Sequence, residues 1–561
     1  MAGMGVGQPD RLANIPVETG ECVMVCLHSR KRVWLAALAV AAAGMGAPGA
    51  LGQQGKAKSA EVGAACCAAV KAETGGDGAA EAKRRFAERA EKIVEGPAGA
   101  KAEWGILVVE GETGAVLYEK NADRYFVPAS NMKLFATALA LEKLGKGYRF
   151  HTTLETRAAM TKQGRLRGDL VLVGRGDPNL SGRKFPYAPG AEFDGPPERA
   201  LADLAEQLKE RGVREIDGGI VGDDSYFPRE RYPAGWEVDD MVWSYGAAVS
   251  ALAVNDNTVK LTVAPGEFAG DAARILVEPA TGDFTVRNGV VTAAAGTKAA
   301  VRLVREPGAR WVEVQGTVPA GGAERRMTLA VQEPAEQAAE MMKRVLEERG
   351  IRVWGAARAR HEAEQEKEAA YVMAEHVSAP LGEAVAAVNK LSENLHTELL
   401  LRTAARQAGA WREFSEVAKY AGEFYAQAGI AAGDVVQSDA SGLSRKDMVT
   451  PRAIVTLLRY AEKQAWFGAY YDSLPVAGVD GTLGERMKSS AAAGKVHAKT
   501  GTVEHVRALS GFAEVGGGRR VVFSFLTNNH GGKNGEAAGE LDGLAGAVVE
   551  EFGEGEMAGR P

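Results

Sequence analysis

The spacing of apolar and polar residues predicts the first elements of the chain. Residues 104–110 and 115–119 are short apolar runs on either side of the turn sequence Gly-Glu-Thr-Gly at 111–114, which predicts a β-hairpin. Apolar anchors among charged residues predict a helix over 81–94, and a second periodic segment predicts a helix from about 130 to 144. Helices and strands are therefore mixed in this part of the chain.

The middle of the chain, residues 151–377, has a different pattern. Strands are expected at 168–173 and 215–221, with an amphipathic helix at 198–211 between them. Residues 256–318 hold short strands and turn signals without a helical pattern, which predicts a small all-β module. Strand, helix and strand patterns return afterwards, at 327–331, 335–349 and 353–359.

The C-terminal part returns to the mixed pattern of the first elements. A helical pattern extends from 381 to 427 and a last helix is expected at 535–552, with strands between them at 496–499, 508–515 and 521–526. We therefore expect an α+β domain that is split around a large insertion. The expected parts are the split domain (81–150 and 378–553), an inserted α/β module (151–255 and 319–377) and a nested β module (256–318).

Length and composition are those of a multidomain globular protein. The chain has 561 residues, of which 46% are hydrophobic and 25% charged, and at roughly 150 residues per domain its length corresponds to about three to four domains. The net charge of −6 provides no basic field, so we expect no nucleic-acid partner. The eight histidines show no His-Glu-x-x-His pattern, and we expect neither a metal nor another cofactor.

Residues 1–52 have the order of a secretory signal. Arg30-Lys-Arg32 precedes a short alanine-rich apolar run, and Ala50-Leu-Gly52 offers a cleavage site between small residues. The run is too short for a comfortable membrane span of about 20 residues, although retention as an anchor is the alternative. We expect an exported protein of the periplasm or cell envelope, peripheral to the membrane at most, with residues 53–80 as a flexible linker.

The cysteines support a core that does not depend on disulfides. All four precede the predicted domains, at Cys22, Cys26, Cys66 and Cys67. Hydrophobic burial must therefore hold the folded part together.

Two copies of the pattern Ser-x-x-Lys occur, and their surroundings distinguish them. Ser130-Asn-Met-Lys133 opens the predicted helix at 130–144, where residues three apart share a face and the lysine amine lies beside the hydroxyl. A serine hydroxyl needs a base to become a nucleophile, and a lysine serves if burial keeps it neutral. Ser181-Gly-Arg-Lys184 is followed by two prolines, so we expect a loop without catalytic chemistry.

Two further tripeptides complete a set. Ser392-Glu-Asn394 lies in the helical region, and Lys499-Thr-Gly501, continued by Thr502, lies on a strand that is expected at the edge of a sheet. An edge strand pairs with an extended peptide, and glycine lets the backbone approach closely. Lysine and threonine side chains beside it suit a substrate carboxylate. Ser-x-x-Lys, Ser-x-Asn and Lys-Thr-Gly in this order define the penicillin-recognising serine enzymes.

The sequence resembles the D-alanyl-D-alanine carboxypeptidases/endopeptidases of the low-molecular-mass class C penicillin-binding proteins, over roughly residues 85–550. Ser392 lies 262 residues after Ser130, which matches the long insertion of this family; compact β-lactamases lack it. Further family-like segments are 174–180, 232–236, 246–252, 439–445 and 474–483. Ala440, where the family often has glycine, is a small departure. The resemblance implies a β-lactamase/transpeptidase-like fold, an antiparallel sheet with flanking helices.

The resemblance also implies roles for the motif residues. Ser130 would be the acylated nucleophile and Lys133 its general base. Ser392 would relay a proton toward the leaving amine, and Asn394 would orient the substrate amide and Lys133.

On the strand, Lys499 would supply positive potential, and Thr500 and Thr502 would bind the terminal carboxylate of the substrate. Gly501 would allow close approach. The backbone N–H groups of Ser130 and Thr502 would form the oxyanion hole.

Family members also hold the side chain of the stem peptide in a pocket walled by the insertion. Asp223 and Phe227 fall in a matching segment, Arg445 ends another, and Glu504 is expected to flank the cleft. An aspartate pairs with a free amine and an arginine with a carboxylate. The alternative is a turn aspartate, a core phenylalanine and a structural arginine.

The implied activity is hydrolysis of peptidoglycan stem peptides, by removal of the terminal D-Ala, cleavage of cross-links, or both. β-Lactams would be covalent inhibitors that acylate Ser130. A β-lactamase-like hydrolase is one alternative, although no separate deacylating carboxylate is identifiable. A non-catalytic protein that binds cell-wall peptide is another, and the intact motifs argue against it.

Overall fold

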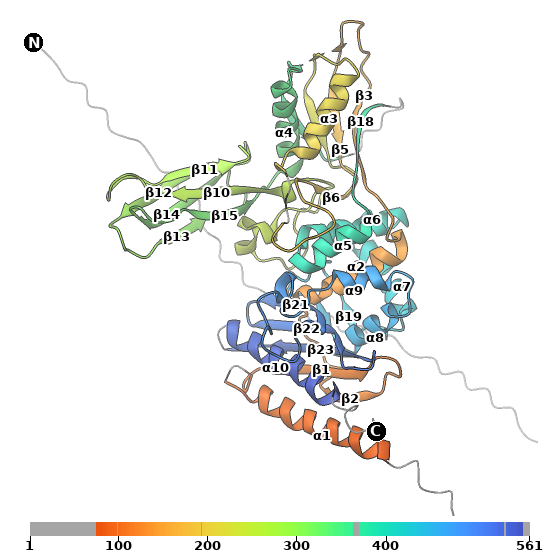
Figure 1. Cartoon of the computed structure of the whole chain (residues 1–561). Helices are drawn as coiled ribbons and strands as arrows, with labels where there is room; N and C mark the ends of the chain where they lie inside the picture. The colour runs from red at the N-terminus through yellow and green to blue at the C-terminus, as the bar shows by residue number, and fades with distance from the viewer. Residues whose placement is uncertain are drawn as a thin grey trace, which may run out of the picture. The chain divides into compact units, whose positions relative to one another are not determined.

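The computed structural model describes residues 74–97, 99–191, 193, 195–362, 370–531 and 534–553, without the side chains of residues 74–77 and 534 (Figure 1). The expected secretory signal, the expected linker up to residue 73 and all four cysteines lie outside these residues. None of the helices in the described ranges is both long enough and apolar enough to cross a membrane.

A five-stranded antiparallel sheet joins the two ends of the described chain. Its strands lie in the order β2-β1-β23-β22-β21, so β21 is an edge strand. The first two form the expected hairpin and the last three are the expected C-terminal strands. The strand bounds are β1 (Glu103–Glu110), β2 (Val116–Lys120), β21 (Val496–Val503), β22 (Val506–Glu514) and β23 (Arg520–Asn528).

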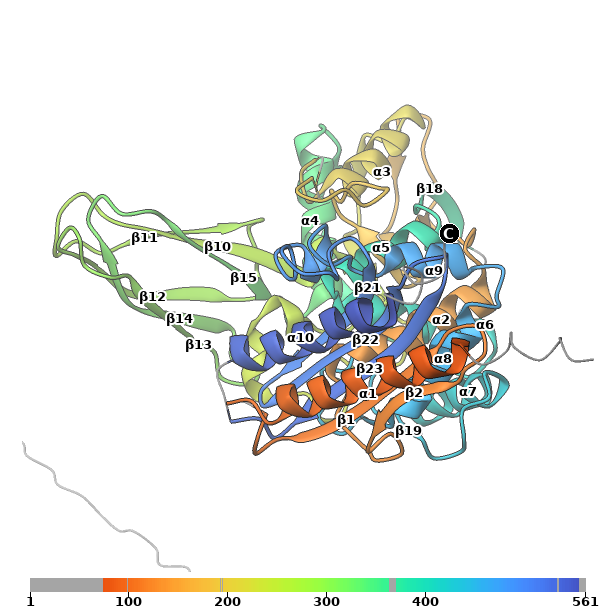
Figure 2. The ribbon, with the colours of Figure 1, turned by 60° about the horizontal axis from the view of Figure 1, so that its bottom comes forward.

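Helices cover both faces of this sheet, because successive side chains of its central strands point to opposite faces and are apolar on both. Ile106 and Val108 pack with α1 (Thr74–Val94) and α10 (Asn534–Gly553), which lie side by side over the sheet in Figure 2. Leu107 and Val109 belong to a second core, with residues of α2 (Met132–Leu144) and α8 (Pro451–Ala461).

Helix α1 begins seven residues earlier than its apolar pattern predicts. The expectation that residues 74–80 belong to a flexible linker is therefore wrong. The side chains of residues 78–80 are exposed. Exposed side chains at 78–80 leave no apolar signal in the sequence.

Further helices pack against α2 and α8. The helical pattern expected over 381–427 consists of three helices, with breaks at Ser392-Glu393 and at residues 408–413. A two-stranded sheet of β19 (Val435–Val436) and β20 (Met448–Val449) lies beyond them. The helix bounds are α5 (Leu381–Leu391), α6 (Asn394–Gln407), α7 (Phe414–Gln427) and α9 (Phe467–Ser473).

The inserted α/β part has a mixed five-stranded sheet in the order β17-β8-β5-β3-β18. Its strands are β3 (His151–Thr156), β5 (Leu170–Val173), β8 (Ile220–Asp223), β17 (Ala357–Arg360) and β18 (Tyr371–Val377), and it packs with α3 (Arg199–Glu210) and α4 (Pro334–Glu348). Smaller sheets pair β4 (Arg165–Leu166), β7 (Glu215–Ile216) and β16 (Arg352–Val353), and β6 (Asp177–Leu180) with β9 (Leu252–Val254). The single strand expected at 215–221 is divided into β7 and β8.

The chain enters and leaves the insertion at one place. Strands β3 and β18 pair antiparallel, with His151 opposite Val377. Just outside them, the N–H of Ser378 donates to the carbonyl of Phe150 at 3.0 Å, and the N–H of Phe150 donates to the Ser378 hydroxyl at 2.9 Å.

Two three-stranded sheets form the nested β module and share one apolar core. One sheet has the order β11-β10-β15, with β10 (Thr258–Ala264), β11 (Arg274–Glu278) and β15 (Arg325–Ala330). The other has the order β12-β14-β13, with β12 (Thr285–Ala293), β13 (Ala300–Val304) and β14 (Trp311–Pro319). The expected end of this module at residue 318 is wrong, because β15 pairs with β10 rather than with the α/β sheet.

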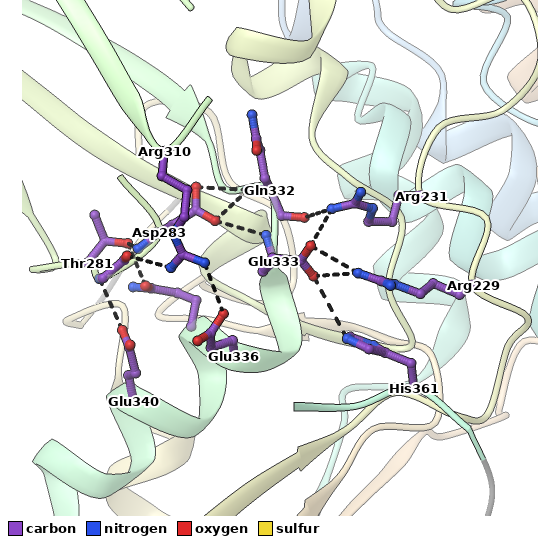
Figure 3. A network of polar contacts seen from close by, with 12 residues as sticks. Arg229, Arg231, Thr281, Asp283, Arg310, Gln332, Glu333, Glu336, Glu340 and His361 are labelled. Atoms are coloured by element: carbon purple, nitrogen blue, oxygen red, sulfur yellow. Dashed lines mark hydrogen bonds and ion pairs between the residues drawn. The ribbon is translucent and has the colours of Figure 1, made fainter. Parts of the chain in front are cut away.

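A polar network attaches the β module to the N-terminus of α4, and Asp283 and Arg305 are its buried pair (Figure 3). The Asp283 carboxylate accepts hydrogen bonds from the N–H of Gln332 and the N–H of Glu333, at 3.0 and 2.9 Å, and pairs with Arg305 at 2.7 Å. The Glu333 carboxylate pairs in turn with Arg231 at 2.6 Å.

Candidate active site

Ser130 and Lys133 lie at the start of α2, as their spacing predicts. A short 3-10 turn, Ala129–Asn131, leads directly into the helix. The Lys133 amine lies 2.9 Å from the Ser130 hydroxyl. The other Ser-x-x-Lys copy, Ser181 to Lys184, follows β6 in a loop, also as expected.

The Lys133 side chain is fully buried and held by three partners. Besides Ser130, its amine contacts the Asn394 side-chain oxygen at 2.5 Å and the Ser441 carbonyl at 2.7 Å. Burial lowers the pKa of Lys133 to about 8, and the nearby Asp439 and Glu398 carboxylates oppose this shift. An amine with this pKa exists partly as a free base near neutral pH.

Two buried carboxylates hold the loop that carries Ser441. Glu398 accepts hydrogen bonds from the N–H groups of Ala440 and Ser441, at 2.8 and 3.0 Å. Asp439 accepts from the N–H of Gly442 at 2.6 Å. Gly442 has φ +76°, and a Cβ there would lie 1.8 Å from the Ala129 carbonyl. Glycine is therefore required for this loop to approach Ser130.

Ser392 stands between α5 and α6 in a left-handed conformation, with φ 63° and ψ 40°. This conformation is unfavourable for a residue with a Cβ. It ends α5 and lets Asn394 begin α6. The Ser392 hydroxyl accepts a hydrogen bond from the Lys499 amine at 2.9 Å.

Lys499 lies on the edge strand β21 and is also fully buried. Its amine donates to the Thr500 carbonyl at 3.0 Å as well as to Ser392. Burial, and then the positive charge of Lys133, hold the pKa of Lys499 well below its usual range. An anion bound nearby would favour the charged form of Lys499 and with it the expected positive potential.

The rest of the Lys-Thr-Gly-Thr segment faces the same space. The Thr500 hydroxyl lies 2.7 Å from the Thr482 hydroxyl. A Cβ on Gly501 would lie 2.8 Å from the Pro128 carbonyl, so glycine allows the close packing of β21 on the turn before Ser130. An open cleft of ≈ 670 Å³ is lined by Ser130, Ser392, Asn394, Thr500 and Thr502.

Residues of the insertion form another part of this cleft, and sequence reasoning missed them. Glu237, Asp239, Asp240 and Tyr245 all line it. The Tyr245 carbonyl accepts a hydrogen bond from the Asn394 side-chain amide at 2.8 Å. Burial raises the pKa of Asp240, and the nearby Glu237 carboxylate raises it further. These residues lie between the family-like segments 232–236 and 246–252, and that position was the one indication in the sequence that they belong to the site.

Arg445 lines the cleft as expected, and it is already paired. Its guanidinium lies 2.6 Å from the Glu237 carboxylate and donates to the Glu504 carbonyl at 3.0 Å. Glu504 lines the cleft as well. Arg445 thus links the insertion to the end of β21.

Asp223 and Phe227 do not line the cleft, and their expected role in substrate binding is not supported. Asp223, at the end of β8, pairs with Arg360 at 2.5 Å and accepts a hydrogen bond from the N–H of Ser225 at 2.9 Å. Phe227 is buried in an apolar cluster with Trp236 and Leu399. The alternative of a turn aspartate and a core phenylalanine describes both residues.

Comparison with known proteins agrees with this geometry. The D-Ala-D-Ala carboxypeptidase 3 (S13) family matches residues 86–546. A D-alanyl-D-alanine carboxypeptidase of Actinomadura sp. (strain R39) is 34% identical over 459 residues, which cover 79% of this chain and 81% of that protein. The carboxypeptidase DacB of Haemophilus influenzae is 25% identical over 434 residues, covering 76% of this chain and 85% of the relative.

The fold agrees as well. The crystal structure of penicillin binding protein 4 (dacB) from Haemophilus influenzae superposes with a TM-score of 0.71 at 23% identity, covering 83% of this chain and 99% of the other. The expected α+β, transpeptidase-like fold is thereby confirmed. On the family match over most of its length, the chain belongs to the D-Ala-D-Ala carboxypeptidase 3 (S13) family.

Proposed function

We propose that the protein is a serine-type D-Ala-D-Ala carboxypeptidase that acts on peptidoglycan stem peptides. The observation that carries this proposal is the buried Lys133 amine, 2.9 Å from the Ser130 hydroxyl and with a pKa lowered to about 8. A base of this kind beside a serine at the floor of an open cleft is suited to acyl transfer.

Acylation begins with proton transfer from Ser130 to the neutral amine of Lys133. The Ser130 oxygen attacks the carbonyl of the penultimate D-Ala, and the backbone N–H groups of Ser130 and Thr502 stabilise the oxyanion. Ser392, bonded to Lys499, passes its proton to the leaving amine and is reprotonated with the proton that Lys133 took from Ser130, and D-Ala departs. Water then hydrolyses the ester on Ser130 and regenerates the free hydroxyl.

The acidic part of the cleft indicates which stem peptides fit. Glu237, Asp239, Asp240 and Glu504 line it, and Arg445 pairs with two of these carboxylates, Glu237 at 2.6 Å and Glu504 at 3.9 Å. A stem peptide with a free amine on its side chain complements the remaining negative charge. Cleavage of cross-links, besides removal of the terminal D-Ala, belongs to the proposal.

We further propose that β-lactams acylate Ser130 and that the protein is exported to the periplasm or cell envelope. The relative from Haemophilus influenzae has been crystallised in complex with a β-lactam. Export places the enzyme with its substrate and leaves it peripheral to the membrane at most.

The test uses the purified full chain with a labelled β-lactam and with a peptide that ends in D-Ala-D-Ala. We expect a stable adduct on Ser130 and release of D-Ala, and neither in the Ser130→Ala variant. Rapid turnover of the drug without peptide cleavage would identify a β-lactamase instead. Absence of both reactions in the unmodified chain would favour a non-catalytic peptide-binding protein.

A further inference from the structure

Arg507 is a buried cation of the cleft that none of the three motifs contains. It lies on β22 directly opposite Thr502 of the edge strand. Directly opposed residues of an antiparallel pair point to the same face. Both residues line the cleft, and Arg507 is only 3% exposed.

The guanidinium of Arg507 is only partly satisfied. One nitrogen, Nη1, donates to the carbonyls of Val503 and Val506 at 2.7 and 2.6 Å. The other terminal nitrogen, Nη2, is buried and has no hydrogen-bond partner. Among the described residues no carboxylate pairs with Arg507, and this differs from every other arginine named in the active site.

A second arginine near Arg507 adds to the positive charge around it. Arg486, which also lines the cleft, is neutralised by Asp542 on α10 at 2.7 Å. Burial, and then the positive charge of Arg486, lower the pKa of Arg507. A buried charge without a counter-ion is costly, and such sites are commonly completed by a ligand of opposite charge.

We propose that Arg507 binds the terminal carboxylate of the substrate, together with Thr500 and Thr502. This inference rests on the proposed function and adds a residue to it. A carboxylate at the two threonines supplies the missing anion and gives the guanidinium an acceptor for charge-assisted hydrogen bonds. The same anion also stabilises the charged form of Lys499, whose amine donates to the Thr500 carbonyl.

Two matched peptides test the proposal on the full chain. One ends in D-Ala-D-Ala with a free carboxylate, and the other is its C-terminal carboxamide. For Arg507→Gln we expect kcat/KM on the free acid to fall roughly 10- to 100-fold, as for lost hydrogen bonds to a charged group. We expect the value on the carboxamide to stay within about twofold of that of the unmodified enzyme, since hydrogen bonds to neutral groups contribute less.

A control and a second variant separate recognition from folding. Arg459→Gln is the control, because its guanidinium also donates to backbone carbonyls, those of Gly111 and Glu112, and does not line the cleft. Arg507→Lys keeps the charge but not the planar fork, and we expect an intermediate loss on the free acid alone. An equal loss on both peptides, accompanied by a lower melting temperature, would mean that Arg507 only holds the turn at 503–506 and would overturn the proposal.

Acylation by benzylpenicillin and by its methyl ester provides a second readout if the carboxamide is too slow to follow. We expect Arg507→Gln to slow acylation by the acid and to leave acylation by the ester unchanged. An unchanged ratio of acid to ester would contradict the role of Arg507. Failure of the unmodified chain to release D-Ala or to be acylated would instead contradict the proposed function.

Discussion

Lys133 and Lys499 are both fully buried, but their surroundings differ. Each contacts a motif serine at 2.9 Å, Lys133 the hydroxyl of Ser130 and Lys499 that of Ser392. The nearby charges that act on Lys133 come first from Asp439 and Glu398, whereas the charge that acts on Lys499 is that of Lys133 itself.

The comparison shows how one residue type serves two purposes. Carboxylates behind Lys133 limit the loss of its proton affinity, so its pKa stays near 8 and the amine exchanges protons near neutral pH. No carboxylate opposes the lowering of the Lys499 pKa in the same way, and a substrate anion bound nearby would favour its charged form. On the helical side of the cleft, Lys133 can therefore act as a base before substrate binds. On the strand side, bound substrate would favour the charged form of Lys499.

The largest expected effect is loss of the base. Lys133→Ala should reduce acylation of Ser130 by a labelled β-lactam at least about 10³-fold, because it removes the basic group that lies 2.9 Å from the hydroxyl. Lys184→Ala, in the other Ser-x-x-Lys copy, is the matched control and should acylate normally. Substantial acylation in Lys133→Ala would show that a different group is the base.

Loss of Lys499 should have the next largest effect. Lys499→Gln removes the cation that the substrate carboxylate stabilises, and we expect about a 10²- to 10³-fold fall in kcat/KM on the D-Ala-D-Ala peptide. Lys495→Gln, an exposed lysine just before β21, is the control. The acid limb of the pH profile should stay in place, because Lys133 sets it; a shift of that limb would mean that the two lysines titrate together.

Neutralising a carboxylate behind the base should shift the pH profile without removing activity. Acylation requires neutral Lys133, so its rate should rise with pH through the Lys133 pKa of about 8. The Glu398 carboxylate raises that pKa, so Glu398→Gln should move the acid limb to lower pH, by up to about one unit. Glu462→Gln, which alters an arginine-paired carboxylate away from the cleft, should leave the limb unchanged. A shift toward higher pH would contradict the assignment.

The smallest effect is expected at Glu393, the middle residue of Ser392-Glu-Asn394. Its carboxylate also raises the pKa of Lys133, but less than Glu398 does. It is partly exposed and already pairs with Arg183 of the insertion at 2.8 Å. Glu393→Gln should therefore move the acid limb in the same direction by only a few tenths of a unit. A shift larger than that of Glu398→Gln would contradict the expectation that the buried Glu398 affects the pKa of Lys133 more than the partly exposed Glu393 does.

The sequence predicts the parts of the site that depend on local structure. Ser130 and Lys133 are one turn apart on one helix, and the Lys-Thr-Gly segment shows its edge strand through its alternating pattern. Family resemblance adds Ser392, which lies on a break between helices, and Asn394, which begins α6. These residues meet because the fold brings three segments to one place.

The errors concern partners that are distant along the chain. From the sequence alone, Asp223 is expected to bind substrate. In the structure its carboxylate is paired with Arg360, which lies 137 residues away along the chain. Arg507 looks like any strand residue until the sheet places it opposite Thr502. The pattern of β15 is equally compatible with either sheet of the insertion. The partners of these residues and strands are set by the tertiary fold, and the local pattern of apolar and polar residues does not predict them.

The hydrogen bonds between Phe150 and Ser378 have a consequence for how such a protein could have evolved. Because the chain departs and returns at adjacent residues, a short turn could replace residues 151–377 without redirecting either flanking segment. A compact ancestor could therefore have acquired the whole segment in one genetic event. Reversal would be harder, because Phe227 now packs on Leu399 of α6 and Arg183 binds Glu393 in a catalytic motif. Loss of the insertion would therefore also remove partners of α6 and of the Ser-x-Asn motif, although the path of the chain alone would allow it.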